Sequence, residues 1–198
     1  GGTCYLAKFG DAHFRYMGGV TWRSPGLELN DMGYLRQADV IMEWVWAQYR
    51  KLEPFSIFRQ IWLNMNQWKG WNFGGEDTFT GANINFHFQL KNHWYGGGNI
   101  SVNGRNLSVG ALRGGPSLYL PSRFSTYSYL QTDQRKALRV TGEYYHSTGN
   151  DKISHQNNFS VDLTWKPVDA FSLSMEPFYN INLDNLQYID TIEYDEED

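Results

Sequence analysis

Apolar and polar residues alternate one by one along much of this 198-residue chain. Over residues 80–91 one parity is apolar and the other is polar; the apolar positions are Ala82, Ile84, Phe86, Phe88 and Leu90, and the polar ones include Asn83, Asn85, His87 and Gln89. A helix would mix these two sets on every face, because its period is 3.6 residues rather than two. The alternation therefore predicts β-strands that have one apolar and one polar face.

The same pattern recurs along the chain and predicts about ten strands. Segments 38–50 and 55–68 are less regular, but they are rich in β-branched and aromatic residues, so we interpret both as strands. Most of these strands are longer than the roughly 5–6 residues typical of soluble sheets, and reach the 9–11 that a tilted membrane strand needs. The predicted strands are 3–9, 12–23, 38–50, 55–68, 79–91, 94–104, 117–131, 136–147, 154–166 and 170–182.

Aromatic residues make up 17% of the chain, an unusual share, and several fall near the ends of the predicted apolar faces. Examples are Trp22, Trp68, Trp94 and Trp165. Rings at such positions are typical of the headgroup level of a membrane barrel. We therefore expect an all-β protein, an antiparallel transmembrane β-barrel in a bacterial outer membrane. The alternative is a large soluble sandwich whose aromatic residues fill the core.

The lengths of the predicted connections also alternate, as in outer-membrane barrels with tight periplasmic turns and long external loops. The long ones are 24–37, 69–78 and 105–116. This alternation predicts that both ends of the chain lie on the external side. Residues 1–183 would then be a section of a larger barrel, and 184–198 an acidic external loop or tail.

Two external loops hold the candidate ligand-binding residues. In the first loop, carboxylates, an amide and a guanidinium suit a hard cation or sugar hydroxyls, although we favour turn capping and local pairing as their role; they are Glu28, Asn30, Asp31, Arg36 and Asp39. In the second, Arg113, Gly114 and Gly115 allow a ligand or a plug to approach the backbone closely, or form a bend at the barrel rim.

Motifs for catalysis are sparse. The chain has no HExxH and no GxSxG sequence, and its single Cys4 excludes an internal disulfide and a cysteine-based zinc site. We therefore assign no catalytic residue, no metal and no cofactor. Several titratable residues are expected to face the barrel interior by parity: His13, Arg15, His87, Arg139, Glu143 and Asp162. A barrel-embedded hydrolase that uses His13 or His87 remains open, and the formal charge of -4 argues against a nucleic-acid partner.

Three stretches together resemble a family of Bacteroidetes outer-membrane proteins of unknown function. They are SPGLELNDMGYLRQAD at 24–39, EWVWAQYRK at 43–51 and ALRGGPSLYLPS at 111–122, within a resemblance that extends from about Gly10 to Tyr188. Members of that family typically carry an N-terminal module resembling carbohydrate-binding family 9, followed by a large C-terminal membrane barrel. The resemblance implies that this chain is part of the barrel, and it supplies no catalytic residues.

The expected function is accordingly that of an outer-membrane barrel that serves as a membrane anchor, an envelope-complex component or a solute pore. Its expected partners are outer-membrane lipid and lipopolysaccharide, with other envelope proteins or glycans as further candidates. A carbohydrate-binding protein that presents its external loops is the first alternative, and the barrel-embedded hydrolase is the second.

Overall fold

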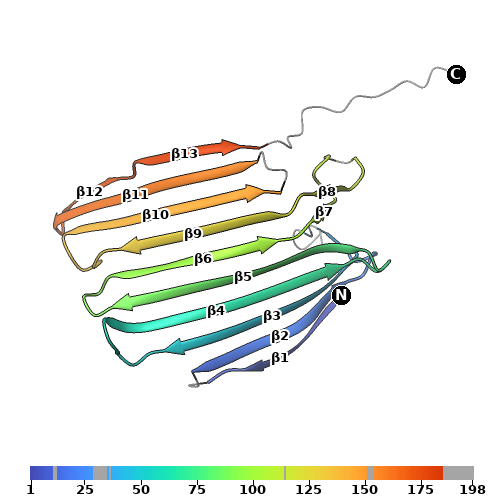
Figure 1. Cartoon of the computed structure of the whole chain (residues 1–198), viewed down its shortest axis with the longest axis horizontal. Helices are drawn as coiled ribbons and strands as arrows, with labels where there is room; N and C mark the ends of the chain where they lie inside the picture. Colours follow the sequence, from blue (N-terminus) through green and yellow to red (C-terminus); the bar gives the residue numbers. More distant parts are fainter. Residues whose placement is uncertain (11–12, 29–34, 36, 114, 151–153, 185–198) are drawn as a thin grey trace, which may run out of the picture.

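A computed structural model describes residues 1–10, 13–28, 35, 37–113, 115–150 and 154–184 of the chain. Eleven strands form one antiparallel sheet, and a small hairpin of two strands stands apart from it. Figure 1 shows the sheet strands side by side in chain order, apart from the inserted hairpin. The strands are β1 (Gly2–Lys8), β2 (Phe14–Arg23), β3 (Val40–Lys51), β4 (Phe58–Trp71), β5 (Asp77–Leu90), β6 (Tyr95–Asn103), β7 (Asn106–Ser108), β8 (Leu118–Leu120), β9 (Arg123–Gln131), β10 (Leu138–Gly149), β11 (His155–Val168), β12 (Phe171–Met175) and β13 (Phe178–Leu183).

The predicted all-β, antiparallel class is confirmed, and each predicted strand overlaps an observed one. Two of the predicted strands need correction. The predicted strand 117–131 divides, because Leu118–Leu120 turns away to pair with Asn106–Ser108 in a hairpin that the sequence analysis missed. The predicted strand 170–182 divides at Pro177, which accepts a bond from Val161 N through its carbonyl but has no N–H to return.

The connections gather at two ends of the sheet. At one end lie 24–39, 72–76, 104–122 and 150–154, and at the other lie the short connections 9–13, 52–57, 91–94, 132–137 and 169–170. Figure 1 shows β1 beginning and β13 ending at the end that carries the hairpin β7–β8. The predicted long connection 69–78 is in fact short, because β4 and β5 extend to Trp71 and Asp77.

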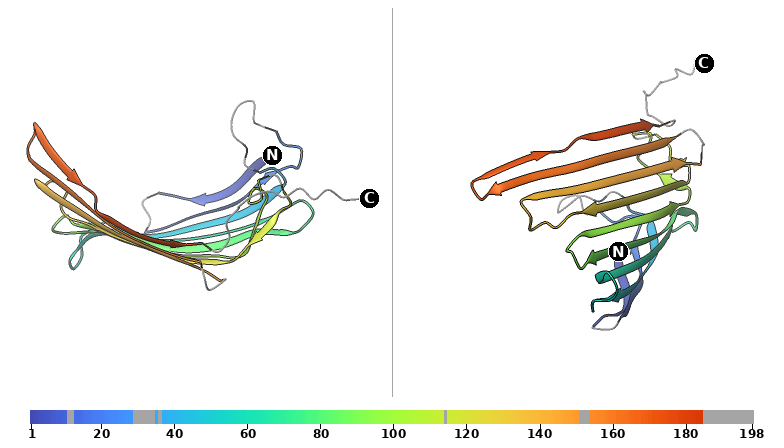
Figure 2. Two further views of the ribbon diagram at one scale, coloured as in Figure 1. Left: turned by 90° about the horizontal axis from the view of Figure 1, so that it is seen from above. Right: turned by 60° about the vertical axis from the view of Figure 1, so that its left-hand side comes forward.

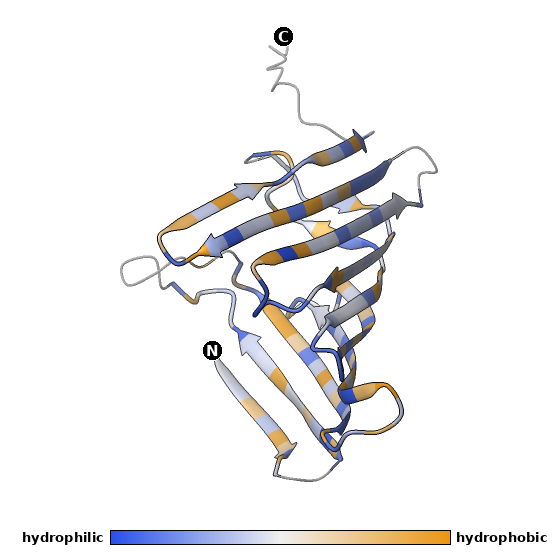
Figure 3. Ribbon diagram, turned by 90° about the vertical axis from the view of Figure 1, so that its left-hand side faces the viewer, coloured by the Kyte–Doolittle hydropathy of each residue, from blue (hydrophilic) through white to orange (hydrophobic). Residues whose placement is uncertain are grey.

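The sheet is a single layer without a hydrophobic core. Val40, which is 6% exposed, is the one buried hydrophobic side chain among the described residues. Bands of contrasting hydropathy alternate along the strands in Figure 3, and the register places large apolar side chains of neighbouring strands on one face. These side chains are exposed; they include Leu6, Val45, Met65, Ile84, Phe86, Ile100, Leu130, Tyr144, Phe159 and Trp165. We call this surface the apolar face.

The opposite surface, which we call the polar face, is more crowded. Its buried residues include Asn64, Ser101 and Ser147, the last only 1% exposed. Figure 2 shows the sheet curved into an open trough. Side chains on the inside of a curved sheet converge, so the polar face lines the inside of the trough and the apolar face its outside.

The trough is open along both long sides. The strand order ends at β1 on one side and at β12 and β13 on the other, and these edges do not pair with each other. The described part of the chain contains no helix that could span a lipid bilayer.

Candidate functional site

Amide side chains from adjacent strands meet in the middle of the polar face. The register aligns Gln48 of β3, Asn64 of β4 and Asn85 of β5 in one row across the sheet. Gln48 Nε2 donates to Asn64 Oδ1 at 2.8 Å, and Asn64 Nδ2 donates to Asn85 Oδ1 at the same distance. We call these three residues the amide row. Each primary amide both donates and accepts, so the row forms a continuous chain of hydrogen bonds.

The amide row continues at both ends into other polar groups. Arg15 Nη1 donates to Gln48 Oε1 at 3.4 Å, and Asn85 Nδ2 donates to Asn83 Oδ1 at 3.2 Å. The Arg15 guanidinium also lies 5.3 Å from the centroid of the Phe9 ring and 5.8 Å from that of Trp46. Its charge is therefore held against aromatic faces and an amide oxygen.

Beyond the amide row, phenols and one imidazole form a second polar cluster. His87 Nδ1 lies 2.9 Å from the hydroxyl of Tyr129, and the His87 ring stacks nearly parallel to Tyr95 at 6.5 Å between centroids. Gly97 of β6 aligns with His87 on one side and with Tyr129 on the other. A Cβ on Gly97 would lie 2.5 Å from Phe86 O and 2.8 Å from His87 Nδ1. The absence of a side chain at this position lets the three strands bring His87 and Tyr129 together.

All six titratable residues expected to face the interior lie on the polar face. The register aligns Arg15 with Gln48, His87 with Trp62, and Glu143 with Tyr129, and the parity of the same strands includes His13, Arg139 and Asp162. They are spread along the face rather than gathered into one centre. The described residues contain no group of three His, Cys, Asp or Glu side chains that could hold a metal ion.

The imidazole contacts give no support to a nucleophilic triad. The partners of His13, His87, His93 and His146 are a backbone carbonyl, a phenol, a guanidinium and an amide. Serine activation would need an imidazole within hydrogen-bond reach of a serine hydroxyl. None of these four imidazole contacts has that geometry.

The structure describes some of the candidate residues of the first predicted loop. Asp39 adopts a positive φ of 54°, and its Oδ1 accepts a hydrogen bond from Phe73 N at 2.8 Å. This carboxylate therefore links the connection 24–39 to the connection 72–76. Glu28 is exposed, while Asn30, Asp31 and Arg36 lie outside the described residues.

The second predicted loop forms turns at the same end of the sheet. Arg113 is exposed, has a φ of 50°, and its backbone N donates to Gly110 O. Gly115 N donates to Leu112 O, and Gly114 lies outside the described residues. The described residues of this loop thus form turns at this end of the sheet.

Two adjoining hollows at this end were not foreseen. They measure about 550 and 610 Å³, and both are lined by Asn103, Gly104, Asn106, Ser108 and Gly110. Arg123 and Asp184 also line the first hollow, and Gln37, Trp68 and Phe79 also line the second. The hairpin β7–β8 therefore lies over the end of the polar face, where it is held by a 3.4 Å bond from the Tyr119 hydroxyl to Asp77 O.

Trp68 lies on the polar face, contrary to the prediction that it ends an apolar one. It aligns with Trp44 and with Gly81, and a Cβ on Gly81 would lie 2.5 Å from the Trp68 ring. The indole therefore lies across the backbone of β5. Trp22 and Trp165 do lie on the apolar face, beside Ile41 and Leu138. Parity alone misassigned Trp68 because both parities of its strand carry apolar residues.

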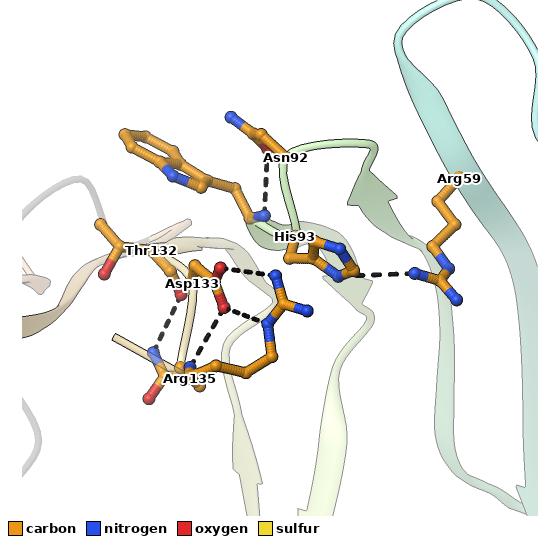
Figure 4. Close-up of polar contacts among 8 residues, drawn as sticks. Arg59, Asn92, His93, Thr132, Asp133 and Arg135 are labelled. Atoms are coloured by element: carbon orange, nitrogen blue, oxygen red, sulfur yellow. Dashed lines mark hydrogen bonds and ion pairs between the residues drawn. The ribbon is translucent and has the colours of Figure 1, made fainter. Parts of the chain in front are cut away.

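Polar residues of the short connections form a cluster at the opposite end of the sheet, shown in Figure 4. Asp133 accepts bonds from the Arg135 backbone N, Nε and Nη2 at 3.1, 2.9 and 2.8 Å. These contacts hold the pKa of the Asp133 carboxyl well below its usual value. Nearby, Arg59 Nη1 lies 3.4 Å from His93 Nδ1.

Comparison with known proteins identifies one related group. Residues 2–198 match a family described as a domain of unknown function (DUF5916). No curated protein and no solved structure matches the chain.

Proposed function

The chain belongs to the DUF5916 family, and from this premise we propose that it forms the wall of a transmembrane β-barrel in a bacterial outer membrane. The observation that carries the proposal is the apolar face. It runs across the sheet, its large side chains are exposed, and no second layer of the described residues covers it. An exposed apolar surface of this extent needs a nonaqueous environment, because isolated apolar patches on soluble monomers are far smaller.

The dimensions of the apolar face suit a bilayer. On β5 it runs from Ala82 to Leu90, which spans about 27 Å along the strand. These nine residues match the 9–11 that a tilted transmembrane strand needs. Polar groups border the band at both ends of the strand: Lys69 and Asp77 form a 3.1 Å ion pair at one, and Lys91 follows at the other.

The open edges support the proposal that these strands form part of a barrel wall rather than a complete barrel. The edge strands β12 and β13 are exposed on both faces, and β1 is exposed along most of its length. Unpaired backbone groups cannot remain at a sheet edge in hydrocarbon, because no water is present to satisfy them. The proposal therefore includes further strands that pair with both edges and close the barrel.

The resulting role is that of an anchor, an envelope-complex component or a solute pore, with outer-membrane lipid and lipopolysaccharide as its surroundings. The polar face would line the interior. The amide row and the phenol cluster contribute neutral polar groups to that interior, which suits water and neutral solutes.

Membrane fractionation of the full-length protein tests this proposal. We expect the protein to co-sediment with outer membranes, and to remain folded by circular dichroism only in detergent or lipid. The control is the same protein transferred to detergent-free buffer, where we expect aggregation. A folded, monodisperse species in that buffer would instead support a soluble sandwich and overturn the proposal.

A further inference from the structure

We infer that the two adjoining hollows beneath the hairpin β7–β8 form a binding site for a neutral, hydroxyl-rich ligand of the oligosaccharide class. We call them together the hairpin site. They share five lining residues and lie at the end of the polar face. Each hollow, at about 550 and 610 Å³, is within the range of small-molecule sites. This inference does not depend on the membrane location proposed above.

The hairpin site has an aromatic floor. Trp68 lies across Gly81 of β5, and Phe79 lies across Gly70 of β4, where a Cβ on either glycine would come within 2.6 Å of the ring. The two pairs are adjacent in the β4–β5 register. Both rings thus lie flat against the backbone, and both line the second hollow. Flat rings that are held in place offer a stacking surface at little cost in side-chain entropy.

The remaining lining supplies hydrogen-bonding groups. Gln37, Asn103 and Asn106 contribute primary amides, and Ser108 contributes a hydroxyl. A primary amide can donate and accept at the same time, which matches a sugar hydroxyl that does the same. Sugar rings also present C–H faces that pack on aromatic rings. The combination of stacking floor and amide walls therefore fits an oligosaccharide.

The charge of the lining favours a neutral ligand. Among the described residues, no charged side chain lines the second hollow. The first hollow has one cation, Arg123, and one anion, Asp184. A phosphate or polyuronate ligand would need an excess of cations, which this lining does not offer.

Binding of defined sugars to the full chain in detergent micelles tests the inference. We expect maltohexaose, cellohexaose or chitohexaose, at up to about 10 mM, to change tryptophan fluorescence and to give a saturable isotherm by calorimetry. Trp68→Ala should weaken this binding about tenfold, the usual effect of losing one stacking contact. Trp165→Ala is the matched control, because that indole lies on the apolar face; it should bind as the parent does.

Asn103→Leu provides a second variant, since it replaces the amide by an apolar side chain of similar size and leaves the aromatic floor unchanged. We expect it to weaken sugar binding while the circular dichroism spectrum stays unchanged. If Trp68→Ala does not fold, Asn103→Leu alone decides the question. Insertion of each variant into lipid vesicles is measured in parallel, so that failure of sugar binding is separated from failure of the barrel proposal.

Several outcomes would overturn the inference. Absence of saturable binding for all three neutral sugars would refute the inference. Binding of adenosine or of an oligogalacturonate in their place would show that the ligand class is wrong. Equal loss of binding in Trp68→Ala and Trp165→Ala, or no loss in Asn103→Leu, would show that the sugar binds elsewhere.

Discussion

Neighbouring residues on one strand of this protein have opposite surroundings. Phe86 is 46% exposed on the apolar face, whereas Asn85 accepts a 2.8 Å hydrogen bond from Asn64 on the polar face. Successive side chains of a strand point to opposite sides of the sheet, so one step along the chain exchanges one environment for the other. The effect of a substitution therefore depends first on which face of the sheet the substituted residue occupies.

A charge on the apolar face should be costly. If the apolar face lies in hydrocarbon as proposed, we predict that Phe86→Arg lowers the free energy of unfolding in lipid by about 2–4 kcal/mol, because it places a cation at mid-strand. Asn99→Arg on the polar face is the control, since Asn99 aligns with Asn85 and its new side chain would face the polar interior. Urea titration of both variants in lipid vesicles gives the two values. An equal or larger loss for Asn99→Arg would contradict the assignment of faces.

The Asp133 carboxylate should make stability depend on pH. Its contacts with Arg135 lower its pKa in the folded state below the ordinary 3.8. A depressed pKa stabilises the folded state above the ordinary value, and this contribution is lost as the pH falls through that value toward the folded pKa. Asp133→Asn should therefore lower the thermal midpoint near pH 7 and have a smaller effect near pH 3.

The control for this measurement is Glu53→Gln, an exposed change in another short connection. We expect its effect on the midpoint to be small at both pH values. An Asp133→Asn effect that stays constant between the two pH values would argue that the carboxylate acts only through packing and hydrogen-bond geometry.

The strands β5, β6 and β9 pack closely where Gly97 lies between them. Gly97 of β6 aligns with His87 and Tyr129, and its hydrogen is surrounded by Phe86 O, His87 Nδ1 and the Tyr129 ring. Gly142 of β10 is also inside a strand, but a Cβ there would meet no atom within 4 Å. The two glycines thus have different structural roles.

This contrast predicts opposite effects of alanine. Gly97→Ala should destabilise the sheet by about 1–3 kcal/mol, because the added methyl group forces the strands or the His87–Tyr129 pair apart. Gly142→Ala should be neutral or stabilise by up to about 1 kcal/mol, because it reduces the freedom of the unfolded chain. Denaturant midpoints of the two variants in detergent measure both effects. Destabilisation of the same size at both positions would contradict the role assigned to Gly97.

The arrangement of connections divides the whole molecule into two ends. Glu76 lies in the connection 72–76 at the hairpin end, while Glu53 and Asp169 lie in connections at the opposite end. If the sheet spans the outer membrane as proposed, these two ends lie in different compartments. Long connections are external in such barrels, so the hairpin end is expected to face outward.

Thiol labelling of the full-length protein on intact cells tests this orientation. In a Cys4→Ser background, Glu76→Cys should react with a membrane-impermeant reagent, whereas Glu53→Cys and Asp169→Cys should react only after the outer membrane is opened. The reverse pattern would invert the orientation. Equal labelling at all three sites on intact cells would argue against a membrane wall.

The sequence by itself determined the all-β class, most of the strands, and the two faces of those strands that alternate regularly. Alternation is a local property, because side-chain direction follows from backbone geometry one residue at a time. It therefore predicted the apolar positions of β5 and the shared face of His87, Arg15 and Glu143. Local signals also explain the break at Pro177, although the alternation predicts one continuous strand over 170–182.

The tertiary structure alone decided which residues of different strands meet. Register depends on how strands shift against one another, so the alignment of Asn64 with Asn85 could not be read from either strand alone. Trp68 shares the parity of Asn64 and Asn66, but only the register shows that its indole lies across Gly81 of the next strand. The hairpin site arises because β7–β8 folds back over the sheet end, where residues distant in sequence come together.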